Sequence, residues 1–330
     1  MSASWTQQDR VINFSARLSL VLSILVLAIK FFAYEMTKST AVFSDAVESI
    51  VNVIAALVAL FVMKAVAEPA DEEHPYGHGK LEYFSAAFEG GLIAFAAIAI
   101  GIEAVRALIH EKVLRQPDIG LYVMGAAALI NLLLGLHLRT VGRKFRSEAL
   151  KASATHVLSD VWTSVGVMGG LAIVHVTGLA WIDPLVGVLI ALQLGYSGYR
   201  IVRQSIGALI DEKEPKVLRE LVASFNKAKK KWVIDIHQMK MIRSGRFHHI
   251  DAHMVVPEYW NVAETHEATT EFEKEVVSAY SFDAEIAFHV DPCEKKYCRT
   301  CEMLDCQIRQ EPFEAVRPMS VETVVRGPLP

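Results

Sequence analysis

The stretch ATHVLSDVWTSVGVMGGLAIVHV, residues 154–176, decides the fold class of this chain. Its only ionisable side chains are His156, Asp160 and His175, and the rest is mostly apolar. A helix needs about 20 mostly apolar residues to cross the hydrocarbon core of a bilayer. The stretch is long enough, so it predicts a membrane-spanning helix that carries a histidine and an aspartate at membrane depth.

Apolar blocks of this length recur along the first two thirds of the chain, which is 52% hydrophobic with a mean hydropathy of +0.31. Six blocks run approximately over residues 11–34, 40–66, 83–109, 119–138, 149–176 and 182–206. After Asp211 the charge density rises and no further block appears. We therefore expect an all-α membrane bundle of six helices over residues 1–210, followed by a soluble domain.

The basic residues of the short loops predict the orientation. The loop RTVGRKFRSEALK, residues 139–151, is rich in arginine and lysine, including Arg146, whereas the opposite loops hold few basic residues, such as Lys112 and Arg115. Basic loops mark the cytoplasmic side. The pattern predicts that both termini lie in the cytoplasm. We expect a multi-pass protein of the cell's inner (cytoplasmic) membrane.

Two of the blocks carry a polar stripe. His156 and Asp160 lie four residues apart, and Asp45, Glu48 and Asn52 follow one another at offsets of three and four, so each group shares one helix face. Carboxylates in one pocket repel each other unless a proton or a cation lies between them. The stripes thus predict a site for a divalent cation in the membrane. The alternative is an interhelical hydrogen-bond network that holds the bundle together.

Three other polar residues of the blocks have simpler interpretations. Lys30 is expected to extend toward the membrane surface from near the end of its block. Asp183, directly before Pro184, is expected to cap the N-terminus of its own helix. Glu89 fits either proton movement or pairing with a neighbour.

The loop AEPADEEHPYGHGKLEYF, residues 67–84, offers a carboxylate and two imidazoles in Asp71, His74 and His78. Two histidines and a carboxylate can hold Zn²⁺ with an open position; the alternative is a polar connecting loop. Lys80 and Asp211 are candidates for an ion pair near the membrane surface.

The soluble part alternates helical and extended patterns. The order is helix (216–230), strand (232–242), strand (246–256), helix (262–280) and strand (284–291). An α-β-β-α-β order predicts a ferredoxin-like α+β domain, a small open sheet with helices on one face, over residues 211–292. The remaining residues, 293–330, form an extension whose proline-rich tail, from about Glu311, is expected to be irregular.

All four cysteines lie within CEKKYCRTCEMLDC, residues 293–306. Clustered thiols in the cytosol are more typical of metal binding than of disulfides. Cys293, Cys298, Cys301 and Cys306 can hold Zn²⁺ tetrahedrally, as a structural staple, a sensor or a transfer point for metal. The alternative is redox reactivity of free thiols.

Several motifs together resemble one family. HPYGHGKLEYFSA, residues 74–86, resembles the signature loop of the cation diffusion facilitator family, HVLSD at 156–160 is similar to its fifth-helix motif, and FSDAVESIVN at 43–52 to its second-helix motif. The resemblance implies a homodimeric transporter, not an enzyme, that exports divalent transition metals from the cytosol in exchange for protons.

The resemblance also implies particular site residues. The transport site would use Glu48, Asn52, His156 and Asp160, although a register with Asp45 and Ser49 stays open. Asn52 departs from the family's commoner aspartate and leaves the identity of the metal open, but a histidine in the fifth helix usually accompanies zinc in this family. Zn²⁺ is therefore the expected ion, with Fe, Co, Ni, Cd and Mn as alternatives. Further sites are implied near the membrane at Asp71, His74 and His78, and in the metallochaperone-like cytoplasmic domain at His237, His253, His266, His289 and Asp291. Lys80 and Asp211 would form an interlock between protomers.

Two other classes of function remain open. A membrane-anchored metal sensor or scaffold would bind metal without transporting it. A membrane metalloenzyme would need an activated water beside a general base, yet THEATT at 265–270 lacks the second histidine of His-Glu-x-x-His. No nucleic-acid partner is expected.

Overall fold

The computed structural model describes residues 7–66, 68–109, 117–145, 147–245 and 247–327. Three basic loop residues used above, Lys112, Arg115 and Arg146, lie outside these ranges. The contacts divide the chain into two units, residues 1–210 and 211–330. Each unit is described by itself.

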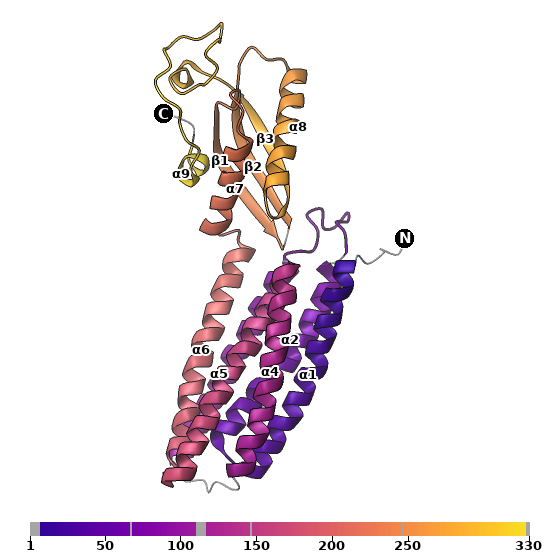
Figure 1. Cartoon of the computed structure of the whole chain (residues 1–330), viewed down its shortest axis with the longest axis vertical. Helices are drawn as coiled ribbons and strands as arrows, with labels where there is room; N and C mark the ends of the chain where they lie inside the picture. Colours follow the sequence, from indigo (N-terminus) through magenta and orange to yellow (C-terminus); the bar gives the residue numbers. More distant parts are fainter. Residues whose placement is uncertain (1–6, 67, 110–116, 146, 246, 328–330) are drawn as a thin grey trace. The chain divides into compact units, whose positions relative to one another are not determined.

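The described part of the first unit is made of six long helices. They are α1 (Gln7–Thr37), α2 (Thr40–Val66), α3 (Leu81–Ile109), α4 (Pro117–Lys144), α5 (Glu148–Thr177) and α6 (Ile182–Leu209) (Figure 1). All six are long and apolar enough to cross a membrane, which confirms the predicted bundle. Large apolar side chains remain on its outside, among them Phe95, Tyr122, Trp162 and Leu192. Such a surface suits contact with lipid and would be costly in water.

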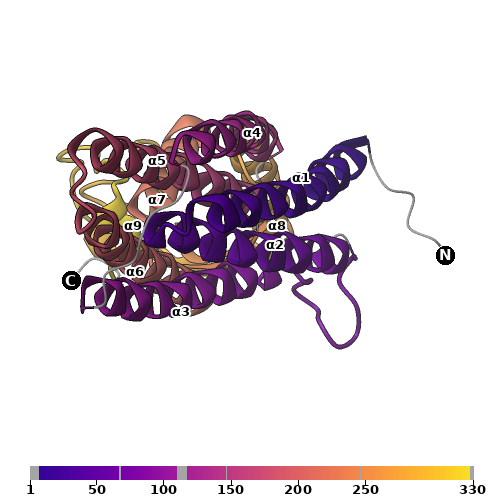
Figure 2. The ribbon, with the colours of Figure 1, turned by 90° about the horizontal axis from the view of Figure 1, so that it is seen from below.

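The helices pack in a defined pattern, viewed along the bundle in Figure 2. Helix α3 packs mainly against α6 and α4 against α5, while α2 contacts α1, α3 and α5. The α3–α6 contact depends on glycine, because a Cβ on Gly198 would lie 2.8 Å from the carbonyl oxygen of Gly90. Small residues let membrane helices approach closely. This packing places α2 and α5, which carry the polar stripes, next to each other.

Asp183 caps a different helix from the one that the sequence predicts. It lies within the first turn of α6, but its carboxylate accepts a hydrogen bond from the Thr40 backbone N–H at 2.7 Å and from Ser39 Oγ at 2.5 Å. The prediction that it caps its own helix was therefore wrong. Asp183 instead satisfies the free N–H groups at the start of α2, since a helix N-terminus favours a negative charge.

The second unit has the predicted α-β-β-α-β order. It contains α7 (Pro215–Ala228), β1 (Asp235–Ser244), β2 (Phe247–Val256), α8 (Val262–Ala279) and β3 (Asp283–Pro292). Strand β2 is central, antiparallel to β1 and parallel to β3. Helices α7 and α8 pack on the sheet through a core that includes Leu221, Phe225, Ile250, Met254 and Phe272. The α+β fold class is confirmed.

A β-bulge interrupts β1. The register pairs His237 with His253 but Lys240 with Asp251, so one extra residue lies between the two pairs. Gln238 has a left-handed φ of +52°, and its N–H donates to the Arg326 carbonyl at 2.7 Å. Because of the extra residue, Ile236 and Met239 both face the core although they are three positions apart.

The extension after β3 packs on the second unit. It contains a short 3₁₀ turn, η1 (Lys295–Tyr297), and a short helix, α9 (Val321–Val325), which contacts β1. The predicted tail is thus mostly irregular but not wholly so. A capping box formed by Ser320 and Thr323 starts α9.

Candidate metal centres

Among the described residues, three groups each bring three candidate ligand atoms within 4.8 Å of one another. They are Glu48, His156 and Asp160; Asp71, His74 and His78; and His237, His253 and Asp291. All nine residues were predicted as ligands. The groups lie in the bundle, in the loop between α2 and α3, and on the three-stranded sheet.

The bundle group joins the two polar stripes. Glu48 and Asn52 come from α2, and His156 and Asp160 from α5; the four side chains are at most 6% exposed. The Asn52 amide nitrogen donates to Asp160 Oδ2, and Asn131 Nδ2 donates to the same oxygen at 3.4 Å. Thr163 Oγ1 donates to Glu48 Oε2 at 3.3 Å. These bonds fix one oxygen of each carboxylate and leave the other available.

Each of the four residues keeps one buried polar atom without a hydrogen-bond partner in the described part of the chain. These atoms are Glu48 Oε1, Asn52 Oδ1, His156 Nε2 and Asp160 Oδ1. Buried polar atoms normally have partners because desolvation is costly. One imidazole nitrogen and three oxygens are ligands suited to a divalent transition metal. The donor set therefore fits a cation.

Asp45 and Ser49, the other register for the helix-two ligands, are engaged elsewhere. Ser164 Oγ lies 3.1 Å from each Asp45 carboxylate oxygen, and Ser49 Oγ donates to the Asp45 backbone carbonyl at 3.2 Å. The close group of ligand atoms contains Glu48 rather than Asp45. Glu89 is buried and its Oε1 also lacks a partner within the described residues, but it is outside the group.

Lys30 does not extend to the membrane surface, and that prediction was wrong. Its side chain is 0% exposed, with Nζ 3.0 Å from Asp45 Oδ2 and 3.9 Å from Asp160 Oδ2. Helix α1 continues to Thr37, so Lys30 lies about two turns inside the helix. A buried charge requires a partner. A lysine within an apolar span therefore indicates a buried acidic partner, and the sequence already displayed this pattern. The bundle group thus has a lysine ammonium among its carboxylates.

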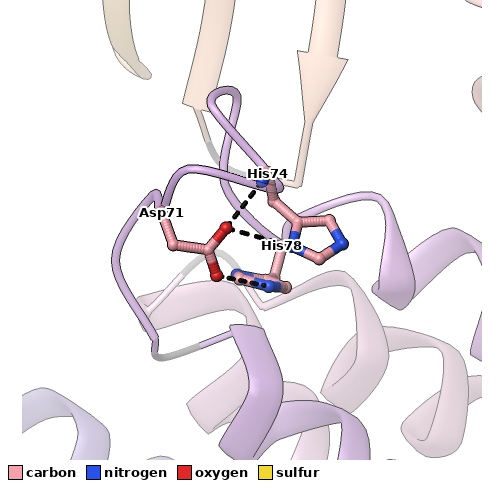
Figure 3. A group of neighbouring side chains, drawn as sticks. All are labelled: Asp71, His74 and His78. Carbon is pink, nitrogen blue, oxygen red and sulfur yellow. Dashed lines mark hydrogen bonds and ion pairs between the residues drawn. The ribbon is translucent and has the colours of Figure 1, made fainter.

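The loop group is built around Asp71 (Figure 3). Asp71 Oδ1 accepts from the His74 backbone N–H at 2.6 Å and lies 3.1 Å from His74 Nδ1, while Oδ2 lies 3.6 Å from His78 Nε2. Gly77, with a φ of +71°, lets the loop turn between the two histidines. The hydrogen bond from the His74 N–H lowers the pKa of the Asp71 carboxyl. Two imidazoles and a carboxylate thus meet at one place.

The sheet group lies on the face opposite the helices. His237, His253 and His289 are neighbours across β1, β2 and β3, and Asp291 follows His289 by two positions on the same face. Asp291 Oδ2 lies 2.9 Å from His253 Nδ1 and 3.7 Å from His237 Nε2, and Oδ1 lies 3.6 Å from His289 Nε2. Burial lowers the pKa of His237, which favours the neutral imidazole that binds metal.

Two residues beside this group were not predicted. Asp235 Oδ2 lies 3.3 Å from His237 Nδ1, and Arg317 of the extension lies 3.7 Å from Asp235 Oδ1. Burial raises the pKa of the Asp235 carboxyl. A carboxylate that orients a histidine from its far nitrogen is a common support for a ligand. Asp235 precedes His237 by two positions in the same strand, so the alternation of side chains along a strand could have placed the two residues on one face.

The remaining predicted residues lie apart from these groups. His266 is on α8 and exposed. The four cysteines line one pocket but do not form a group with three sulfur atoms within 4.8 Å. Lys80 Nζ lies 3.5 Å from the Leu209 carbonyl, and its ion pair with Asp211 stays a prediction.

Both units of the chain are similar in sequence to domains of known proteins. The cation efflux transmembrane domain matches residues 16–210, and the cytoplasmic domain of cation efflux proteins matches residues 214–293. An uncharacterised transporter of Synechocystis is 33% identical over 84% of this chain and 90% of its own length. The cation-efflux pumps FieF of Yersinia pestis and Cronobacter sakazakii are 30% and 29% identical, over 87% and 86% of this chain and 95% and 94% of their own lengths. The chain therefore belongs to the cation diffusion facilitator family of cation efflux transporters, a family of membrane transporters rather than enzymes.

Proposed function

We propose that this protein exports Zn²⁺, and other divalent transition metals to a lesser extent, from the cytosol in exchange for protons. Glu48, Asn52, His156 and Asp160 bind the cargo. The observation that supports the proposal most directly is the one unpartnered buried atom that each of these four residues directs into the bundle. A hydrogen-bond network whose purpose was to hold helices together would have used these atoms.

Exchange for protons follows from the ligand chemistry. Carboxylates and imidazole bind a metal only in their deprotonated forms, so the ion and protons compete for the same atoms. A more acidic outer medium favours protonation and release of the ion. The site must then face the two sides of the membrane in turn, through movement of helices about a fixed site.

We place the soluble unit, both termini and the loop group in the cytoplasm, in a homodimer at the inner membrane. The match to the cytoplasmic domain of cation efflux proteins supports this orientation. His237, His253 and Asp291, with His289 beside them, form a regulatory site, and Asp71, His74 and His78 form another. Metal bound at these sites favours the transporting state only if it binds that state more tightly.

The test is metal flux in proteoliposomes with an acidic interior, with a metal-sensitive dye inside. His156→Asn should reduce Zn²⁺ uptake by at least about a hundredfold, the scale of losing one strong ligand. His175→Asn is the matched control, because it makes the same change in the same helix at an exposed position. Equal flux in the two variants would exclude the proposed site.

The same assay separates transport from a metal sensor or scaffold. A sensor would bind metal at the sheet group yet show no flux in wild-type protein. Collapse of the proton gradient by an ionophore should also stop uptake against a metal gradient. Uptake against a metal gradient that persists after the proton gradient has collapsed would exclude the exchange mechanism.

A further inference from the structure

The cysteine pocket lies outside the sites used so far. Its walls include all four cysteines together with Tyr297 and Arg309, and it encloses about 30 Å³. Cys293 directly follows β3, and the others belong to the turns after it. All four are free thiols. The matched cytoplasmic domain ends at residue 293, so three of the cysteines lie beyond the matched domain.

Hydrogen bonds from the Arg309 side chain to the backbone hold the cysteine turns in place. Arg309 donates to the carbonyl oxygens of Cys298 at 2.5 Å, Cys301 at 2.9 Å and Met303 at 3.0 Å. One guanidinium thereby fixes both ends of the Cys-x2-Cys turn. The backbone N–H of Gln310 points at Cys298 Sγ from 3.5 Å. An N–H directed at sulfur stabilises a thiolate more than a thiol.

We propose that Cys293, Cys298, Cys301 and Cys306 form a tetrathiolate site for a single thiophilic divalent cation, best suited to Zn²⁺. The proposal is independent of the transport site. Four thiolates around one Zn²⁺ leave a net charge of −2. The pocket wall holds Lys295 and Arg309 together with Glu258 and Glu294, and the guanidinium of Arg309 contacts the cysteine turns directly. Since the sulfur atoms do not form a close group without the ion, binding draws the side chains inward around it.

The size of the pocket favours one ion over a cluster. A cavity of about 10–15 Å³ is enough to hold one water molecule. The 30 Å³ of this pocket therefore suits a single ion and small movements of the side chains around it. The spacing Cys-x4-Cys-x2-Cys also occurs in plant-type ferredoxins, whose [2Fe–2S] cluster adds two irons and two sulfides. That cluster would need room for four inorganic atoms instead of one ion.

The site would stabilise a segment that has little core of its own. In the described structure the cysteine turns pack through a small cluster formed by Ile234, Val255, Tyr297 and Cys301, whereas Met319 and Val324, further along the extension, join the main core of the unit. Free energy of metal binding becomes free energy of folding where the ligands are otherwise poorly ordered. A bound ion would thereby hold the segment that leads to Arg317, the residue beside Asp235 in the sheet group.

The first experiment uses full-length protein in detergent, stripped of metal under reducing conditions and titrated with Co²⁺. We expect an intense thiolate-to-cobalt charge-transfer band that saturates at one ion per chain and disappears when Zn²⁺ is added. Cys298→Ser/Cys301→Ser should abolish the band. His156→Asn should keep it while losing flux, so failure of this site is distinguishable from failure of the transport site.

The second experiment needs no variant. Zn²⁺ should slow alkylation of the four thiols in wild-type protein by at least about tenfold, because coordinated thiolates are poorly accessible to the reagent. Unchanged alkylation and no charge-transfer band would overturn the proposal. So would two irons with acid-labile sulfide, or disulfides, in protein as purified.

Discussion

Replacing Lys30 by methionine tests the charge balance of the proposed transport site. The ammonium lies 3.9 Å from Asp160 Oδ2. At an effective dielectric constant of about 20, two unit charges at that distance attract by about 4 kcal/mol. A divalent cation that binds Asp160 must overcome this attraction and also lies close to a like charge. Methionine keeps the length and apolar volume of lysine but removes both effects.

We expect Lys30→Met to bind Zn²⁺ more tightly. The 4 kcal/mol from the lost attraction corresponds to about three orders of magnitude in affinity, and rearrangement of Asp45 and water reduces the expected gain to roughly tenfold to a hundredfold. Release should slow accordingly, so maximal flux should fall. Competition with a fluorescent chelator measures the affinity in detergent, and proteoliposome uptake measures the flux.

Two further variants make the result interpretable. Lys38→Met is the matched control, since Lys38 follows α1 and its ion pair with Glu35 is exposed. Loss of one partner of a buried pair can itself unfold a protein, so Lys30→Met/Asp45→Asn removes both charges together. A folded Lys30→Met variant with wild-type or weaker Zn²⁺ affinity would refute the reasoning, whereas the double variant keeps the net charge of the wild-type site and should bind Zn²⁺ about as tightly as wild type.

Three other predictions concern stability. Gly198→Ala should destabilise the protein by about 1–3 kcal/mol through overpacking, and so lower its melting temperature in detergent. Gly166→Ala, whose Cβ meets nothing within 4 Å, should leave the melting temperature unchanged. Equal melting temperatures for the two variants would contradict the α3–α6 contact. Asp183→Ala should cost about 1–3 kcal/mol because the buried Thr40 N–H loses its acceptor, measurable as faster hydrogen exchange at the start of α2. Burial lowers the pKa of His248 in the folded protein to about 4. As the pH drops, His248 is therefore protonated in the unfolded chain before it is protonated in the folded one, and the free energy of unfolding should fall by about 3 kcal/mol between about pH 6.5 and about pH 4. His248→Phe should flatten that dependence in hydrogen exchange of β2, and an unchanged pH profile would show that another group causes it.

Local pattern was enough to predict the helices of the bundle and the polar side chains that meet inside it. Apolar length predicts the six helices, and an offset of four residues places His156 above Asp160 on one face. The same reasoning pairs Glu48 with Asn52, and the meeting of the two helices follows once both polar stripes must avoid lipid. These predictions depend on periodicity within single helices, which the sequence displays directly.

The errors arise where the partner is distant in the sequence. Asp183 and Thr40 are 143 residues apart, so a carboxylate that looks like the cap of its own helix serves another. Lys30 looked close to a helix end because the end of α1 was placed too early. For the cysteines, spacing shows that one ion can reach all four, but only the fold shows that they share a pocket.

The bulge in β1 limits how this domain can change in length. Upstream of Gln238 the strand presents His237 to the metal side, and downstream it presents Met239 to the core. Deleting one residue there would exchange the inward and outward positions of half the strand. In homologous chains, insertions or deletions at this point should therefore involve two residues. A change of one residue should be accompanied by a second one elsewhere in the strand that restores the inward and outward positions.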